Sequence, residues 1–426
     1  MQIVYYLNMY QTIVIGGGPS GLMSAAAASQ HSDKVLLIEK KKGLGRKLKI
    51  SGGGRCNVTN RLPYDEIIRH IPGNAKFLYS PFSVFDNESI IEFFESRGVQ
   101  LKEEDHGRMF PVSNRAQDVV DALINELSTN NVEVLEETAI KTIKKSDDHF
   151  IIIDAEGNEY TSKTVVIATG GTSVPQTGST GDGYKFAKEL GHTITELFPT
   201  EVPITSKEPF IIRKTLKGLS LKDVSLSVLR KNGKPRITHR MDMLFTHFGV
   251  SGPGALRCSQ FVYKEQKSQK KQEIQMKLDV FPDEKENELQ NRIKKQIHET
   301  PDKYIKNSLR GMIEERYLNF ILEQAGIEEE TTGHHISNQH IAEIAHLFKS
   351  FTFTVNGTLS IEKAFVTGGG VSIKEIEPHT MMSKKTSGLF LCGEVLDIHG
   401  YTGGYNITSA LVTGRVSGMN AGIYQN

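Results

Sequence analysis

Three glycines have the types and spacing of a dinucleotide-binding turn. Gly16, Gly18 and Gly21 follow a short apolar run, Thr12–Ile15, and precede Leu22–Ser29, which is rich in helix formers. A glycine turn between a strand and a helix lets backbone N–H groups and the positive helix end meet a pyrophosphate. The spacing therefore predicts phosphate binding, and the alternative is a tight turn with no ligand.

One carboxylate strengthens this interpretation. Glu39 closes the next apolar run, Val35–Ile38, and lies 21 residues after Gly18. A carboxylate at this distance from the middle glycine can bind the adenosine ribose. The strand, helix and acid together predict a dinucleotide site, but they leave open whether the ligand is FAD or NAD.

Two segments far along the chain favour FAD. The buried run Thr164–Thr169 ends in Gly170 and Gly171, where the backbone must pass close to a neighbour. A later strand ends in Gly393 and Glu394, and an acid in that place can bond a ribityl hydroxyl. The alternative is that these glycines serve only tight packing.

A second glycine turn points to the flavin ring itself. Gly403 and Gly404 precede a helix expected to begin near Asn406. A helix N-terminus can face flavin N1 and the C2 carbonyl and stabilise the negative charge of reduction. NAD sites need neither this turn nor the acid at the earlier strand end.

These motifs resemble known flavoproteins. Glu39, the ATGG run followed by Gly178–Gly183, and GLFLCGE with GG-x-N resemble the FAD fold shared by fumarate reductase and aspartate oxidase. Arg46–Asn60, Gly107–Ser113, Leu244–Leu256 and the HGYTGGYN run are narrower and resemble the BaiN-like, aminoacetone-oxidase-type family. The resemblance covers essentially the whole chain.

The resemblance implies an α/β fold in which a Rossmann-like FAD-binding domain carries an inserted β-barrel-like domain and a helical subdomain. Fumarate reductase binds FAD through a histidine, and the corresponding segment Lys47–Cys56 has none, so we expect non-covalent FAD. The catalytic arginine and histidine motifs of fumarate reductase are also missing, so dicarboxylate chemistry is not expected.

The residues expected to contact FAD come from eight segments of the chain. They are Gly16, Gly18, Pro19, Ser20, Gly21, Glu39, Lys40, Lys47, Ser51, Gly52, Gly53, Arg55, Cys56, Asn57, Ala139, Ala168, Thr169, Gly170, Gly171, Gly181, Asp182, Gly393, Glu394, Gly403, Gly404, Tyr405, Asn406 and Ile407.

Some of these residues have a second interpretation. Cys56 is expected to pack rather than react, because no second cysteine or base is near it in sequence. Asp182 follows Thr180 in the family loop and is also expected to cap the helix that starts near Tyr184.

His247, Arg108 and Tyr401 are the candidate catalytic residues. A histidine or a tyrosine can deliver a proton while flavin N5 exchanges hydride with the substrate. His106 and His399 are alternatives nearby in sequence, and a solvated loop or a structural role is the competing interpretation for all five. The histidines between residues 334 and 346 lack the spacing of metal ligands, so no metal is expected.

Hydrophobic patterns divide the chain into five stretches. We expect residues 1–192 to begin the FAD domain, 193–281 to form the β-rich insertion and 282–350 the helical subdomain. Residues 351–365 would return to the β-rich part, and 366–426 would complete the FAD domain.

Within these stretches the patterns predict a helix over Ala116–Leu127 and strands over Val132–Ile143 and His149–Ala155. Ser220–Leu229 and Glu273–Val280 are expected strands, and Lys264–Lys271 is expected to be a solvated hairpin loop.

Composition excludes several classes. The 51 basic and 50 acidic residues nearly cancel, so no general attraction to nucleic acid or membranes is expected. No apolar run approaches the ~20 residues that span a bilayer. The N-terminus lacks the features of a secretory signal, Met9 could itself be the start, and three widely spaced cysteines suit a reducing cytoplasm.

The sequence thus predicts a cytoplasmic FAD-dependent oxidoreductase acting on a small organic substrate, with oligomeric state left open. No dedicated NAD(P)H domain is visible, because Val366–Ser372 lacks a following acid, so nicotinamide would bind transiently. An NAD(P)H-linked reductase is the first hypothesis. The alternatives are an oxygen-using oxidase of an amine or aminoketone, and a non-enzymatic flavin-binding or tRNA-modification partner.

Overall fold

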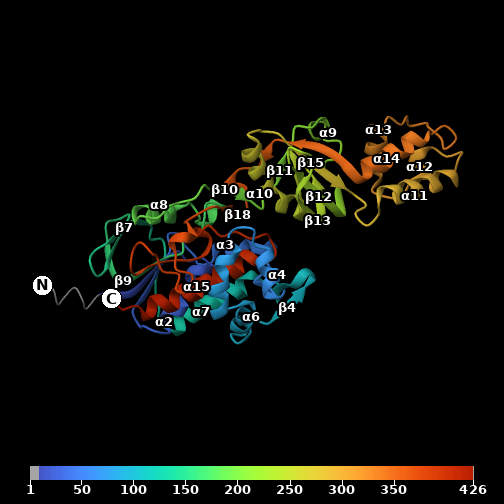
Figure 1. Cartoon of the computed structure of the whole chain (residues 1–426). Coiled ribbons are helices and arrows are strands. Elements are labelled where there is room, and N and C mark those ends of the chain that lie inside the picture. Colours follow the sequence, from blue (N-terminus) through green and yellow to red (C-terminus); the bar gives the residue numbers. More distant parts are fainter. Residues whose placement is uncertain (1–8, 426) are drawn as a thin grey trace. The chain divides into compact units, whose positions relative to one another are not determined.

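The computed structural model describes residues 9–425, which fold into two units (Figure 1). Unit 1 contains the described chain through Phe198 and again from Ile361, and unit 2 is Pro199–Ser360. The first and last parts of the chain therefore build one unit. The expected leader before Met9 lies outside the described residues.

A mainly parallel sheet forms the centre of unit 1. Its strands run in the order β6-β2-β1-β9-β8-β7, and β19 pairs in parallel with the second half of β9. The bounds are β1 (Tyr10–Ile15), β2 (Val35–Ile38), β6 (Glu133–Leu135), β7 (Ile140–Lys145), β8 (Phe150–Asp154), β9 (Glu159–Ile167) and β19 (Leu389–Leu391). β2 and β19 are buried at every position, as expected for strands covered on both faces.

Three helices pack together beside this sheet: α2 (Pro19–Ser29), α7 (Ala116–Thr129) and α15 (Tyr405–Ile423) (Figure 1). A smaller sheet in unit 1 has the order β3-β5-β4. The other elements of unit 1 are α3 (Arg46–Ile50), β3 (Thr59–Asn60), α4 (Tyr64–Arg69), α5 (Tyr79–Val84), α6 (Asn87–Glu95), β4 (Leu101–Glu104), β5 (Arg108–Pro111), α8 (Asp182–Glu189) and β18 (Val366–Gly368), and β10 (Phe198–Thr200) lies at the junction.

Unit 2 is built on an antiparallel sheet of seven strands in the order β16-β15-β12-β13-β14-β11-β17. Its strands and its helices bury one continuous apolar cluster, which includes Leu226 of the sheet and Ile344 of the helices. The bounds are β11 (Ile204–Thr205), α9 (Pro209–Ile212), β12 (Ser220–Leu229), β13 (Pro235–Phe245), β14 (Gly249–Ser251), α10 (Gly252–Gln269), β15 (Ile274–Asp279), α11 (Glu286–His298), α12 (Ile305–Ser308), α13 (Glu315–Gln324), α14 (Asn338–Ser350), β16 (Phe351–Val355) and β17 (Gly357–Thr358).

Three local expectations are wrong. Lys264–Lys271 is not a hairpin loop, because α10 continues to Gln269 and buries Cys258, Val262 and Glu265 on one helical face. The single strand expected over Val132–Ile143 is two strands, β6 and β7, which lie at opposite edges of the sheet. The third concerns Asp182, which begins α8 without capping it, since Gly181 is the N-cap residue.

Among the described residues, none of the helices combines the length and the apolar character needed to cross a membrane.

Candidate functional site

The motifs predicted to bind the dinucleotide meet at one edge of the parallel sheet. Strand register places Ile15 beside both Ile38 and Ile167, and Leu391 beside Ile167. The residues that follow these four strands are the glycine turn, Glu39, the ATGG run and the segment that contains Glu394. Ligands of open α/β sheets bind at this carboxyl edge, so four segments far apart in sequence converge on one site.

The three glycines of the opening turn differ in what a side chain at each position would contact. Gly16 has φ +110°, and a Cβ there would meet the Ala168 carbonyl at the end of β9. A Cβ at Gly21 would overlap the carbonyl oxygen of Gly16, whereas a Cβ at Gly18 would have no neighbour within 4 Å. Gly16 and Gly21 are therefore needed for packing within the protein, and Gly18 faces open space.

Gly18 is also the N-cap residue of α2, and no side chain caps this helix end. The first N–H groups of α2 are consequently left for a ligand, and they carry the positive end of the helix dipole. Pro19 at the first helical position removes one of these donors at no cost. The turn thus offers an anion site in front of open space.

Glu39 is held by the backbone on both carboxylate oxygens. Oε2 accepts the Gly17 N–H at 2.7 Å and Oε1 accepts the Lys41 N–H at 2.9 Å. Each oxygen retains a second lone pair for a hydroxyl donor. The Glu39 carbonyl accepts the Thr138 N–H at 3.0 Å, which places the loop carrying the exposed Ala139 beside this acid.

Lys47 and Glu394, predicted from separate motifs, form an ion pair of 2.8 Å. Ser173 Oγ lies 2.7 Å from Lys47 Nζ and 3.0 Å from Glu394 Oε1, and Oε1 also accepts the Thr367 N–H at 2.8 Å. Both charged side chains are only about a quarter exposed or less, at 27% and 21%. The cluster fixes Glu394 at the strand end where a ribityl hydroxyl is expected.

Replacing Glu394 by Ala is expected to weaken FAD binding by about 10-fold and to lower the free energy of unfolding by about 1–3 kcal/mol. Both effects follow because Lys47, Ser173 and the Thr367 N–H lose a shared acceptor. FAD titration and urea unfolding measure them. The control is Glu88→Ala, which removes the ion pair with Arg61. Because the Glu88 side chain is 55% exposed, this change should alter stability by less than about 0.5 kcal/mol. Unchanged FAD affinity in Glu394→Ala would contradict the ribityl assignment.

Helices α2 and α15 run in parallel and are staggered along their axes. Gly414 packs on Ser20, Gly418 on Ser24 and Gly422 on Ala28, so successive turns stay in step. Gly414 is the tenth residue of α15 and Ser20 is the second of α2. The N-terminus of α15 therefore lies eight residues, about 12 Å, beyond that of α2.

The N-terminus of α15 is a second uncapped helix end. Gly404 is its N-cap residue, with φ +94° and no side-chain cap. Asn406 holds the preceding loop by accepting the Gly400 N–H at 2.8 Å and donating to the Gly400 and Tyr401 carbonyls. With the stagger of about 12 Å, one helix end can meet the pyrophosphate and the other the pyrimidine end of a flavin.

Buried polar atoms without protein partners test whether FAD fits this edge. Asn57 Oδ1, Thr169 Oγ1 and Thr172 Oγ1 are buried and have no hydrogen-bond partner among residues 9–425. A Cβ at Gly404 would lie 3.1 Å from Asn57 Oδ1, which places that atom beside the N-terminus of α15. Buried polar groups in native proteins are nearly always paired, so these atoms point to a polar ligand. The residues present fit FAD.

The segment Ser51–Asn57 has the backbone expected of a close approach. Gly52, Gly53 and Gly54 all have positive φ, and a Cβ at Gly53 or Gly54 would meet nothing within 4 Å. Burial raises the pKa of the Cys56 thiol to about 12. A thiol with that pKa stays protonated at neutral pH, which agrees with packing rather than nucleophilic chemistry.

Asn60 is buried, and its side chain connects two loops of unit 1. Its Nδ2 donates to the carbonyls of His106 and Gly403, both at 3.0 Å, and lies 3.3 Å from the Tyr405 hydroxyl. It thereby joins the loop before Arg108 to the glycine turn of α15. No periodic pattern in the sequence marks this role.

His70 was also missed. Its ring stacks on Tyr405 with centroids 4.8 Å apart, and its carbonyl accepts the Tyr401 N–H at 2.9 Å. This places a titratable side chain beside Tyr401, one of the predicted catalytic residues. The signal in sequence is weak, because a lone histidine at a helix end has no motif around it.

The structure places the remaining predicted residues as follows. Arg108 pairs with Asp105, and the guanidinium of Arg55 lies 4.1 Å from the centre of the Phe110 ring. The ammonium of Lys40 contacts both Thr180 and Asp182. His247 lies exposed in unit 2 between β13 and β14, so its catalytic role stays a prediction.

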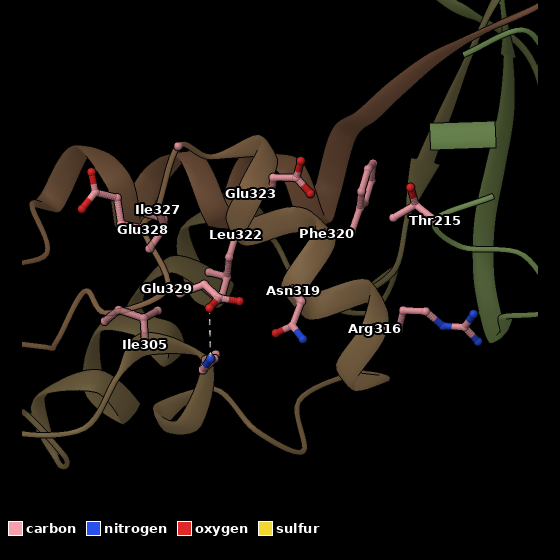
Figure 2. Close-up of a pocket in the computed structure, with 12 residues that line it drawn as sticks. Thr215, Ile305, Arg316, Asn319, Phe320, Leu322, Glu323, Ile327, Glu328 and Glu329 are labelled. Atoms are coloured by element: carbon pink, nitrogen blue, oxygen red, sulfur yellow. Dashed lines mark ion pairs between the residues drawn. The ribbon is translucent and has the colours of Figure 1, made fainter. Parts of the chain in front are cut away.

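A pocket of about 490 Å³ lies among the helices of unit 2 (Figure 2). Phe320 and Leu322 of α13 contribute apolar surface, and Lys306 pairs with Glu329 at 4.0 Å. None of the predicted site residues lines it. In the part of the chain that the structure describes, no three His, Cys, Asp or Glu side chains are grouped to hold a metal ion.

Two curated bacterial enzymes resemble this chain over nearly its whole length. The chain is 29% identical over 401 residues to the ribosomal RNA dihydrouridine synthase of Escherichia coli, covering 94% of this chain and 95% of that one. It is 28% identical over 415 residues to the 3-dehydro-bile acid delta(4,6)-reductase of Clostridium scindens, covering 96% and 98%.

A solved structure shares the fold. The 3-ketosteroid delta1-dehydrogenase of Sterolibacterium denitrificans matches 97% of this chain and 99% of its own with a TM-score of 0.52 at 12% identity. The family model described as the HI0933-like protein Rossmann domain matches residues 10–420. The chain therefore belongs to the HI0933-like family and is an FAD-dependent oxidoreductase of mixed α/β fold.

Proposed function

We propose that this protein uses NAD(P)H to reduce, by way of FAD, a carbon–carbon double bond conjugated to a carbonyl group. The supporting observation is near-full-length similarity to two enzymes whose names describe this one chemistry. Forming dihydrouridine saturates the uracil bond next to a ring carbonyl. A delta(4,6)-reductase acting on a 3-dehydro steroid saturates a bond conjugated to the 3-ketone.

FAD, when bound, supplies hydride transfer at N5. The protein contributes placement and charge. The N-terminus of α15 favours negative charge at the end of the site that it faces. Because hydride addition to such a double bond also requires a proton, Tyr401 and the neighbouring His70 are the candidate donors in unit 1.

Anaerobic mixing tests the proposal in two halves. The FAD-loaded protein is first mixed with NADH or NADPH, and we expect the visible flavin absorbance to bleach. An excess of a conjugated dienone or of uridine is then added without oxygen, and we expect the absorbance to return with one saturated product per flavin. Absence of bleaching would contradict the reductase and leave the oxidase and the flavin-binding roles. Return of colour only with oxygen would contradict the reductase and favour the oxidase.

A further inference from the structure

The charge of the chain is balanced overall but uneven along it. Residues 199–281 contain sixteen Lys and Arg residues against seven Asp and Glu. Much of this excess lies in two short runs, 230–234 (RKNGK) and 264–271 (KEQKSQKK). A local excess of this size creates a positive surface even when the whole chain is neutral.

The fold of unit 2 brings these two runs together. The first is the turn between β12 and β13, and the second is the end of α10 and the residues after it. Gln269 Nε2 of α10 donates to the carbonyl of Leu229, the last residue of β12, at 3.4 Å. Because Arg230 directly follows Leu229 and Lys270 directly follows Gln269, this hydrogen bond holds the two basic runs beside each other.

The two runs contain one acid, Glu265, and the exposed Glu273 follows Lys271 by two residues. Arg230, Lys231, Lys234, Lys270 and Lys271 are exposed, and within the described chain none of them has an acidic side chain within ion-pair distance. We call these five residues the basic surface.

The nearest acid on the helix does not neutralise the basic surface. Glu265 is only 3% exposed on its side chain, and it is bonded to Arg236 at 2.7 Å and to Gln269 at 2.9 Å. Its charge is therefore already engaged inside unit 2.

The chemistry of the basic surface favours RNA over a membrane. Apart from Lys264, Glu265 and Lys267, the other residues of the two runs are Asn, Gln, Ser and Gly, and none of the exposed large apolar side chains of the described chain lies in either run. Membrane-surface segments bury apolar side chains below the headgroups, and this surface has none to bury. Clustered cations with short polar neighbours suit phosphates and 2′-hydroxyl groups.

We infer that the basic surface of unit 2 binds the phosphate backbone of RNA. The inference rests on the proposed function and deepens it by taking the reducible double bond to be that of a uracil base carried by RNA. It departs from the expectation, drawn from the balanced net charge, that no nucleic acid is bound.

Fluorescence anisotropy of a labelled, structured RNA hairpin with the full-length FAD-loaded protein tests it. The variant is Lys231→Glu/Lys270→Glu/Lys271→Glu. We expect binding at least about 10-fold weaker and a slope of log affinity against log salt lower by about three, since each phosphate contact contributes about one.

The matched control is Lys144→Glu/Lys295→Glu/Lys303→Glu, which changes net charge equally at exposed positions elsewhere. We expect it to bind RNA within about twofold of the wild type, and both variants to keep their flavin. Equal losses in the two variants, or no RNA binding by the wild type, would overturn the inference. Binding to phosphatidylserine vesicles without RNA binding would overturn it in favour of a membrane.

The RNA-binding measurements do not depend on catalytic turnover. A failure of RNA binding is therefore distinguishable from a failure of the proposed reduction, which is followed with NAD(P)H and a free dienone or uridine.

Discussion

Gly18→Ala is expected to weaken FAD binding by about 10- to 100-fold while leaving the stability of the FAD-free protein nearly unchanged. Gly18 has φ −80° and ψ −178°, which alanine adopts readily. Its Cβ would meet nothing within 4 Å inside the protein. The small loss at an N-cap and the gain from a less flexible unfolded chain are each below about 1 kcal/mol and oppose each other. The added methyl group should therefore clash mainly with a pyrophosphate bound at the turn.

Gly21→Ala is the matched comparison from the same motif. A Cβ there would overlap the carbonyl oxygen of Gly16, so we expect the FAD-free protein to lose at least about 3 kcal/mol of stability. Urea unfolding of FAD-free samples, together with FAD titration, separates the two variants. If Gly18→Ala destabilised the FAD-free protein as much as Gly21→Ala, the middle glycine would serve packing and not the ligand.

The dinucleotide edge could be predicted from sequence because its signals are local. Gly16 and Gly393 each follow a short apolar run, and a turn after a buried strand must lie at the strand's carboxyl end. Parallel strands then bring all such ends to one side of the sheet. The convergence of Glu39 and Glu394 follows from topology and needs no knowledge of side-chain contacts.

Other features could not be read in this way, since they depend on contacts between distant segments. Asn60 joins residues 106 and 403 through one amide, and the stacking of His70 on Tyr405 spans more than 300 residues. The end of α10 was misread because its lysines and glutamines suit a loop as well as an exposed helix face. The segment is helical because Cys258 and Val262, on the same helix, pack into the core of unit 2.

The net charge of the whole chain also hides a local feature. A total over 426 residues averages a basic stretch, 199–281, with acidic ones elsewhere. Binding by a polyanion depends on the local potential within about 10 Å, the range over which salt screens charge. Only the pairing of β12 with β13 and the course of α10 show which cations share one surface.

Gly418→Ala is expected to lower the free energy of unfolding by about 2–4 kcal/mol, against the direction that helix propensity predicts. In the interior of a helix, Gly→Ala normally stabilises by about 0.5–1 kcal/mol. Here a Cβ would overlap the backbone carbonyl oxygen of Ser24 on α2, and a backbone atom cannot move aside as a side chain can. A decrease in the free energy of unfolding would therefore indicate a packing clash, and an increase would indicate helix propensity.

Asn420→Ala is the control on the same turn of α15. Asn420 is half-buried and, within the described part of the chain, its side chain bonds only the Val416 carbonyl of its own helix. Alanine should therefore leave stability within about 1 kcal/mol of the wild type. Gly418→Ala should also reduce FAD affinity in the protein that remains folded, because separating α2 from α15 would move the two uncapped helix ends that we expect to contact one cofactor. Thermal unfolding with and without added FAD measures both effects. Stabilisation by Gly418→Ala, or an FAD-induced rise in Tm equal to that of the wild type, would show that the close contact of the two helices is not what positions the site.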